Sequence, residues 1–140
     1  MDFEDASCFL ESNHRGVITT NRPDGSSHSS IVVCGLYNQQ PVFVSVYPKS
    51  QKIKNLSRDT RCTFLSVSPD WREWVTVEGK ASLVGYDNTP HEEMRKLLRK
   101  VYMCCSDTEH PDWTEYDEAM VEQEAVIVTV TPEKVYGLLR

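Results

Sequence analysis

The stretch VFVSVYPKSQKIKNLSRDTRCTFLSV, residues 42–67, combines two β-strand patterns with a short amphipathic helix between them. Its valine-rich beginning predicts a strand, which Pro48 breaks. Ser50 is a favourable N-cap residue for a helix through about Arg58, with two apolar residues on its inner face. Residues 61–67 resume the strand pattern, so we expect a strand–helix–strand unit.

The same stretch concentrates positive charge in an acidic protein. The chain has 15 Lys and Arg against 21 Asp and Glu, for a net charge of −6. A third of the cations lie within residues 49–61, namely Lys49, Lys52, Lys54, Arg58 and Arg61. A cation in the first turn of a helix is unfavourable unless an anion binds there too. Lys52, the Ser50 hydroxyl and the backbone N–H groups of that turn therefore predict a phosphate site, to which the Asn55 amide would add a bond.

A simpler interpretation covers part of this basic run. Lys54 and Arg58 are four residues apart on the predicted outer face of the helix, where both would be solvated. Arg61 would pair with Asp59, and Lys49 would be a loop cation. The case for a ligand therefore depends on Lys52 with its neighbours.

The remaining sequence predicts more strands joined by short turns. Residues 28–37 and 40–47 form a hairpin pattern, and a long strand at 73–86 has a bulge or bend at Glu78-Gly79. We expect a last strand pair at residues 125–130 and 134–139, because a turn sequence separates them. Adjacent strands with short connections favour antiparallel pairing, so the predicted fold is mainly β with flanking helices, an antiparallel closed or split β-barrel.

Helical patterns flank these strands. Residues 3–12 predict a short opening helix, and residues 90–103 predict an amphipathic helix that Thr89 would cap. Residues 107–124 contain no Lys or Arg. Either this segment caps a binding groove or repels wrong partners, or, more simply, it is a solvated acidic connection. No repeat or linker divides the chain, so residues 1–140 are expected to form a single domain.

Composition excludes several classes of protein. The acidic balance argues against a nucleic-acid or anionic-membrane partner. No apolar run is long enough to cross a membrane, and the acidic start is unlike a signal peptide, so a cytoplasmic location is expected. Five cysteines without C-x-x-C spacing and four scattered histidines predict neither a disulfide scaffold nor a metal site.

Three segments together resemble a known family: TTNRPDGSSHSSIVV (19–33), residues 42–67, and WVTVEGKASLVG (74–85). They are similar to the split-barrel flavin and deazaflavin oxidoreductases of the pyridoxamine 5′-phosphate oxidase-like superfamily. The resemblance extends from about residue 8 to 139. The branch that uses coenzyme F420 is the most similar, through Ser29-Ser30-Ile31-Val32 and the run from Gln51 to Arg61.

The resemblance implies a homodimer with a cofactor groove at the subunit interface. Lys52 would bind the cofactor phosphate, flanked by Ser50 and Gln51 and supported by Asn55. Ser45 and Val46 would offer backbone groups to the ring. The neighbouring strand would line the groove with Ser29, Ser30 and Ile31.

The implied function is hydride transfer between F420 and an unidentified organic acceptor, with a small molecule as substrate. The alternatives are an FMN-dependent oxidoreductase and a non-catalytic flavin- or haem-binding protein. Vitamin B6 oxidation is not expected, because Ser30 and Gln51 stand where those oxidases have arginines. No catalytic acid is evident, and Tyr47 and Arg72 are candidates by position alone.

Overall fold

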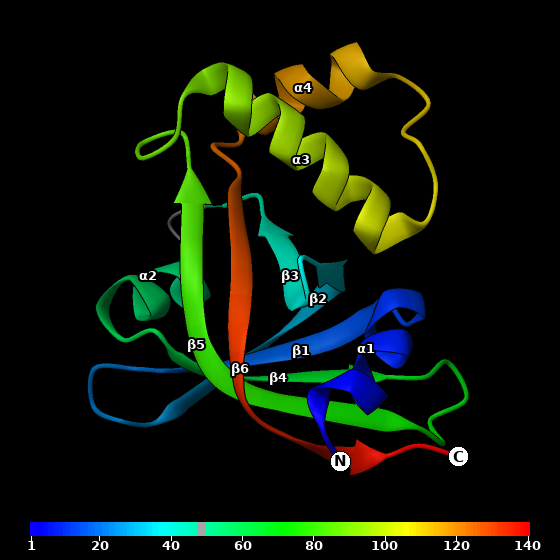
Figure 1. Ribbon diagram of the computed structural model, residues 1–140. Coiled ribbons are helices and arrows are strands. Elements are labelled where there is room, and N and C mark those ends of the chain that lie inside the picture. Colours follow the sequence, from blue (N-terminus) through cyan, green and yellow to red (C-terminus); the bar gives the residue numbers. More distant parts are fainter. Residues whose placement is uncertain (48–49) are drawn as a thin grey trace.

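Six antiparallel strands form a closed barrel in the computed structural model of the protein, which describes residues 1–47 and 50–140 (Figure 1). The predicted β-barrel is thereby confirmed. The strands are β1 (Arg15–Asn21), β2 (Ser27–Tyr37), β3 (Gln40–Ser45), β4 (Arg61–Val67), β5 (Trp74–Gly85) and β6 (Val126–Leu138). Around the barrel their order is β1-β2-β3-β6-β5-β4. Pro48 and Lys49, which the sequence places at the end of a strand and in the basic run, lie outside the described residues.

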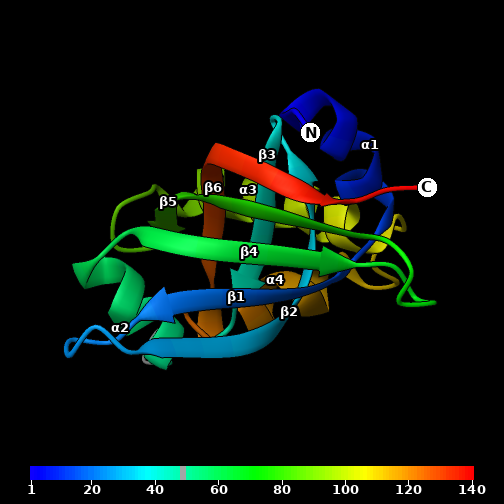
Figure 2. The same ribbon diagram turned by 90° about the horizontal axis from the view of Figure 1, so that it is seen from below.

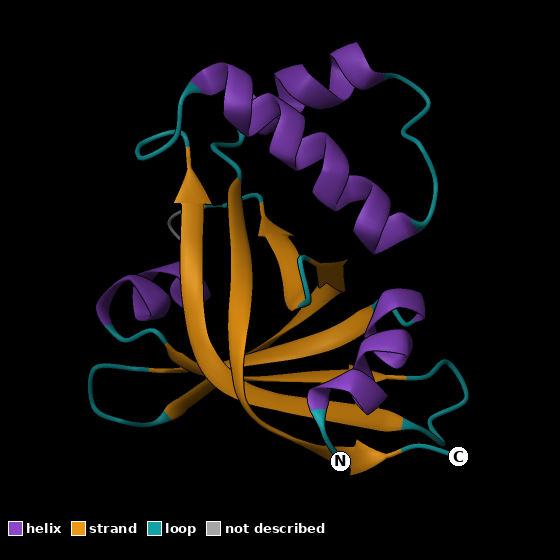
Figure 3. Ribbon diagram, in the orientation of Figure 1, coloured by secondary structure: helices purple, strands orange, loops and turns teal. Residues whose placement is uncertain are grey.

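Helices cover the outside of the barrel. They are α1 (Phe3–Ser12), α2 (Gln51–Arg58), α3 (His91–Ser106) and α4 (Trp113–Glu122). Figure 3 shows α3 and α4 together across one end of the barrel, with α1 and α2 at separate places on its side. Within the described part of the chain, no helix combines the length and the apolar character that crossing a membrane requires.

The strand–helix–strand unit of residues 42–67 forms as predicted. Ile53 and Leu56 of α2 are buried, as the spacing indicates. The preceding hairpin joins β2 to β3 through Asn38 and Gln39, both with positive φ (51° and 61°). Two consecutive left-handed residues are typical of the tight turns whose twist matches a hairpin.

The buried apolar side chains form two hydrophobic clusters. The first fills the barrel and includes the fully buried Phe43, Phe64 and Val77. The second lies outside the barrel, where Met94 and Leu98 of α3 are buried with residues of α4 and β3. Outward-facing valines of β3 therefore form the base on which α3 and α4 pack.

The prediction of two final strands is wrong, because β6 continues through Pro132 as one strand. Its pairing with β5 shifts register at Glu78/Gly79, where Gly79 pairs with Pro132 and Glu78 with Lys134. The predicted bulge site is thus confirmed, and the extra residue is Glu133 of β6. A Cβ on residue 79 would lie 1.9 Å from the Thr131 carbonyl oxygen, so this close approach requires glycine.

The acidic segment 107–124 is not a solvated connection. Its residues include α4, which buries Tyr116 and Met120 against α3. The predicted cap of α3 is also wrong, since Pro90 occupies the N-cap position and Thr89 instead donates to Asn88. Gly85 pairs with Val126, so residues 86–125, with both helices, connect two neighbouring strands.

Candidate functional site: a pocket between the barrel and the α3–α4 pair

A pocket of about 500 Å³ lies between the outer face of β2 and β3 and the helices α3 and α4. Four of the sequence-predicted site residues line it: Ile31, Ser45, Val46 and Lys52. The valines of both strands form an apolar floor, and Lys52 lies at one end. The structure thus brings together residues from β2, β3 and the start of α2 around one cavity.

Lys52 has an electrostatic environment unlike that of the other cations in its run. Within the described residues no carboxylate lies within 4 Å of its ammonium. Partial burial lowers the pKa of Lys52 through desolvation. Arg61 instead pairs with Asp59, at 2.9 Å, as the simpler interpretation predicted. Arg58 donates to the Asn21 carbonyl oxygen.

The start of α2 lies beside this ammonium. Ser50 occupies the predicted N-cap position, but its hydroxyl makes no capping hydrogen bond. Ser45 is the last residue of β3, and its hydroxyl is 3.5 Å from the Ser50 hydroxyl. Among the described residues the Ser50 hydroxyl makes only this long contact, and it lies at the positive end of the helix.

Asn55 makes hydrogen bonds to other side chains of the protein. Its side chain is fully buried, donates to Thr20 Oγ1 at 3.0 Å and accepts from Gln51 Nε2 at 2.7 Å. The described hydrogen bonds of the Asn55 amide thus go to Thr20 and Gln51, and its expected bond to a ligand stays a prediction. Asn55 anchors α2 to β1, and it holds Gln51 in place.

The two predicted serines of β2 lie away from the pocket floor. Ser29 faces outward and its hydroxyl is 2.8 Å from that of Thr19. Ser30 faces inward, and its buried hydroxyl has no hydrogen-bond partner in the described part of the chain. Ile31, next to them, contributes to the floor with its side chain 84% exposed.

Tyr47, Trp71 and Trp74 lie in two separate places. Tyr47 lines the pocket at its exposed end. Trp71 projects into solvent at the turn before β5, and Trp74 contacts the ring of Tyr136 edge to face. These tryptophans and Arg72 are not among the described residues that line the pocket.

The wall opposite the strands was missed by sequence reasoning. It is formed by Tyr102 and Cys105 of α3 and by Tyr116 and Met120 of α4. Trp113, Tyr116 and Met120 are spaced at i, i+3 and i+7, a helical signal that the acidic composition of the segment obscured. Burial raises the pKa of the Cys105 thiol to about 12 and also raises the pKa of Tyr116, so both side chains are neutral at pH 7.

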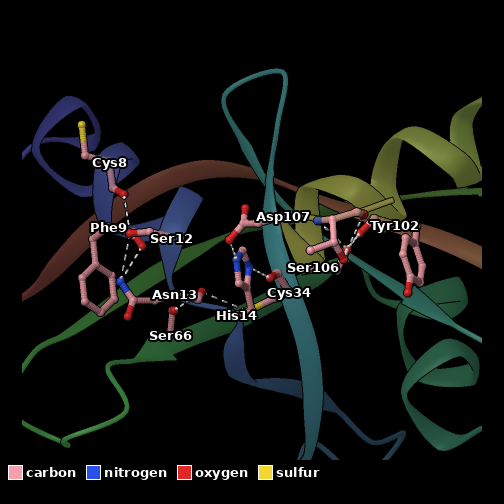
Figure 4. A network of polar contacts seen from close by, with 11 residues as sticks. Cys8, Phe9, Ser12, Asn13, His14, Cys34, Ser66, Tyr102, Ser106 and Asp107 are labelled. Atoms are coloured by element: carbon pink, nitrogen blue, oxygen red, sulfur yellow. Dashed lines mark hydrogen bonds and ion pairs between the residues drawn. The ribbon is translucent and has the colours of Figure 1, made fainter. Parts of the chain in front are cut away.

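A polar network fixes this wall against the barrel (Figure 4). His14, between α1 and β1, places Nε2 2.6 Å from Asp107 Oδ2 and Nδ1 2.8 Å from the Cys34 carbonyl oxygen. Gly35 allows α3 to approach, because a Cβ there would lie 2.2 Å from the Cys104 carbonyl oxygen. The C-terminal end of α3 is thus held on β2 beside the pocket.

Taken together, the pocket has one cationic end, an apolar floor and a neutral aromatic wall. That arrangement suits a ligand with an anionic tail and a flat apolar body. Within the residues that the structure describes, no three His, Cys, Asp or Glu side chains gather closely enough to hold a metal ion.

The family model described as pyridoxamine 5′-phosphate oxidase matches residues 3–139. The chain belongs to the pyridoxamine 5′-phosphate oxidase family. Members of this family bind flavin-type cofactors and include oxidoreductases. The split-barrel resemblance that the sequence motifs carry is thereby confirmed.

Several solved structures are similar to this member of the pyridoxamine 5′-phosphate oxidase family over most of the chain. A conserved hypothetical protein from Mycobacterium tuberculosis has a TM-score of 0.78 and 23% identity, over 98% of this chain and 84% of its own. An F420 reductase has a TM-score of 0.64 and 23% identity, over 93% and 94%. A heme binding protein from Mycobacterium smegmatis has a TM-score of 0.72 and 18% identity, over 97% and 53%. At these identities the likeness shows the fold alone.

Proposed function

We propose that the protein is an oxidoreductase that transfers a hydride between coenzyme F420 and an organic acceptor. The observation that carries this proposal is Lys52, a partly desolvated ammonium that lines a mainly apolar pocket and has no carboxylate partner in the described residues. Desolvating a cation costs free energy unless a negative charge is bound beside it. An anionic cofactor tail would supply that charge.

The residues around Lys52 fit such a tail. The Ser50 hydroxyl is not used as a helix cap, and it lies at the start of α2, where the helix dipole favours an anion. The flat ring would lie on Val44 and Val46, with backbone groups of Ser45 at its edge. When bound, a deazaflavin supplies a hydride, and the protein positions and shields it.

Two features favour F420 over FMN. Ser30 and Gln51 stand where the resemblance to the B6 oxidases calls for arginines, so two phosphate cations of that FMN site are missing. The Gln51–Arg61 run also follows the F420 branch, and the similar F420 reductase spans 93% of the chain. FMN remains the second candidate, because the family binds flavin-type cofactors.

A homodimer would complete the site. On the outer face of the barrel, Ile31 pairs across to Val17, and Val17 pairs to Leu65. Val33 and Val67 flank this apolar row, with Val33 66% exposed. Figure 2 shows the three strands β2, β1 and β4 side by side. Because Ile31 and Val33 also line the pocket, a second copy on this face would close its open side.

The first experiment measures cofactor binding. Purified protein is titrated with F420 and with FMN by fluorescence, alongside Lys52→Met and the matched variant Lys54→Met, which removes an exposed cation of the same helix. We expect F420 to bind more tightly than FMN. Lys52→Met should weaken binding by about tenfold or more, as for a lost charge-assisted hydrogen bond, and Lys54→Met should change it little.

Other outcomes change the assignment. A protein that is yellow as purified, or that binds FMN more tightly, supports an FMN enzyme instead. Equal effects of the two lysine variants would place the anion elsewhere and remove the basis of the proposal. An enzyme is separated from a carrier by following oxidation of the reduced cofactor with a panel of quinones, enones and tetrapyrroles.

A further inference from the structure

The wall formed by α3 and α4 contains four hydrogen-bond donors, and three of them are already used. Tyr116 donates to the Leu98 carbonyl oxygen at 2.9 Å, and Ser106 donates to the Tyr102 carbonyl oxygen at 2.7 Å. Cys105 Sγ lies 3.8 Å from the Val42 carbonyl oxygen. Each of these groups satisfies a backbone carbonyl, which leaves no proton for a ligand.

The fourth donor, the hydroxyl of Tyr102, is uncommitted. Tyr102 lines the pocket, and no hydrogen bond joins its hydroxyl to any residue in the described ranges 1–47 and 50–140. Figure 4 shows its side chain extending from α3 away from the His14 network, with no contact drawn to the hydroxyl. The group is therefore a donor that only solvent or a ligand can satisfy.

Aromatic contacts hold Tyr102 in position without that hydroxyl. Its ring packs edge to face against His110, Trp113 and Tyr116, with centroid separations of 5.2, 5.7 and 5.1 Å. Such contacts orient a ring through its edges and faces. Because Tyr102 lines the pocket with its ring already held by these contacts, a ligand that bonds to its hydroxyl would restrict the side chain little on binding.

We infer that Tyr102 is the specificity-determining residue for the organic acceptor, to whose carbonyl oxygen its hydroxyl donates a hydrogen bond. This inference rests on the proposed oxidoreductase function and names its substrate class, an uncharged and largely apolar ketone or quinone. Cys105 and Tyr116 beside Tyr102 are neutral, and among the described residues that line the pocket only Lys52 is charged, so a charged group bound beside Tyr102 would be unbalanced by the lining. An anionic group would be drawn to Lys52 instead.

The test uses 1-tetralone, an aryl ketone that carries the required oxygen and does not add to thiols. Its binding to the cofactor-free protein is measured by calorimetry for the wild type, Tyr102→Phe and Tyr37→Phe. Tyr102→Phe keeps the ring and its aromatic contacts, so the fold is retained and only the donor is lost. Tyr37→Phe, the matched control, removes the hydroxyl of a tyrosine that is not among the described residues lining the pocket.

We expect Tyr102→Phe to weaken tetralone binding about threefold to tenfold, the loss typical of one neutral hydrogen bond. The carbonyl stretch of bound 13C-labelled tetralone should lie at lower frequency in the wild type and in Tyr37→Phe than in Tyr102→Phe. Equal affinity and equal carbonyl frequency in all three proteins would overturn the inference. So would a wild type that does not bind tetralone.

This test is independent of the cofactor. Failure of both F420 and FMN to bind would remove the proposed function whatever tetralone does. Cofactor binding that depends on Lys52, without a Tyr102 effect on tetralone, would leave the proposed function intact and overturn only the assignment of Tyr102.

Discussion

Asn55 of α2 and Thr20 of β1 are both fully buried, and a 3.0 Å hydrogen bond joins their side chains. Removing the Asn55 amide leaves the Thr20 hydroxyl without its donor and opens a small cavity. We expect Asn55→Ala to lower the free energy of unfolding by about 2 kcal/mol. Urea denaturation measures this, with Lys54→Ala, on the exposed side of the same helix, as the control.

The pairing itself is tested by a double-mutant cycle with Thr20→Val. The effects of Asn55→Ala and Thr20→Val should be clearly less than additive, because both remove one hydrogen bond. Strict additivity would mean that the two side chains stabilise the fold separately.

Gly35 determines how closely α3 packs on β2. A Cβ at this position would lie 2.2 Å from the Cys104 carbonyl oxygen, so Gly35→Ala must displace backbone. We expect a loss of about 2 kcal/mol or more of unfolding free energy, together with weaker tetralone binding, since Cys105 and Ser106 move with the helix. Thermal unfolding and calorimetry measure the two effects.

The matched control for Gly35 is Gly25→Ala. Gly25 has a φ of +86° and no atom within 4 Å of the added carbon, so its cost is that of the backbone conformation alone. The control should leave tetralone binding unchanged. Comparable loss of binding in both variants would contradict the role given to Gly35.

Lys52 should destabilise the ligand-free protein near neutral pH. Desolvation lowers the pKa of Lys52, so the folded state disfavours its charged form. This cost is fully present below the folded-state pKa and is relieved as pH rises towards the unfolded value of about 10.4. Lys52→Met should therefore be more stable than the wild type at pH 7, with a difference that narrows at alkaline pH. A less stable Lys52→Met at pH 7 would contradict this account.

Arg99 of α3 and Asp117 of α4 hold the two helices together, with Arg99 Nε 3.0 Å from Asp117 Oδ1. The hydrogen bond from Arg99 lowers the pKa of Asp117. The stabilisation is present above the unfolded pKa of about 3.9 and is lost as pH falls through the lower folded value. Asp117→Asn should lower the free energy of unfolding at pH 7 and make that free energy fall less steeply as the pH is lowered. Urea denaturation from pH 3 to 7 measures both effects. Glu118→Gln, at the exposed next position, should do neither.

Much of the barrel could be predicted because its signals are local. Alternation, turn residues and Gly79 specify strands and a bulge through backbone sterics and burial. The spacing of Ile53 and Leu56 specifies α2 in the same way. By contrast, the turn signal at Pro132 is overridden, since a β-bulge accommodates the proline beside Gly79 and a 13-residue strand continues past it.

The site was predicted only where local motifs supply it. Lys52 and the ends of β2 and β3 are marked by sequence patterns, whereas Tyr102 enters the pocket because α3 and α4 fold back over β3. That placement depends on tertiary contacts of Gly35, Tyr116 and Met120, which are distant in sequence from the residues they contact. The inward turn of Asn55 towards Thr20 is likewise a tertiary contact that helix periodicity does not specify.

Gly85 and Val126 are partners in the sheet, so the chain leaves the barrel and rejoins it at adjoining positions. Residues 86–125 thus form one insertion between paired strands that carries the aromatic wall, while Lys52 and the valine floor belong to the rest of the chain. A chimera that carries the segment of a relative in place of residues 86–125 should keep the pairing of β5 with β6. It should also take on that relative's preference among organic acceptors. Such an architecture would let the proposed range of acceptors change while the proposed cofactor contacts at Lys52 stay the same.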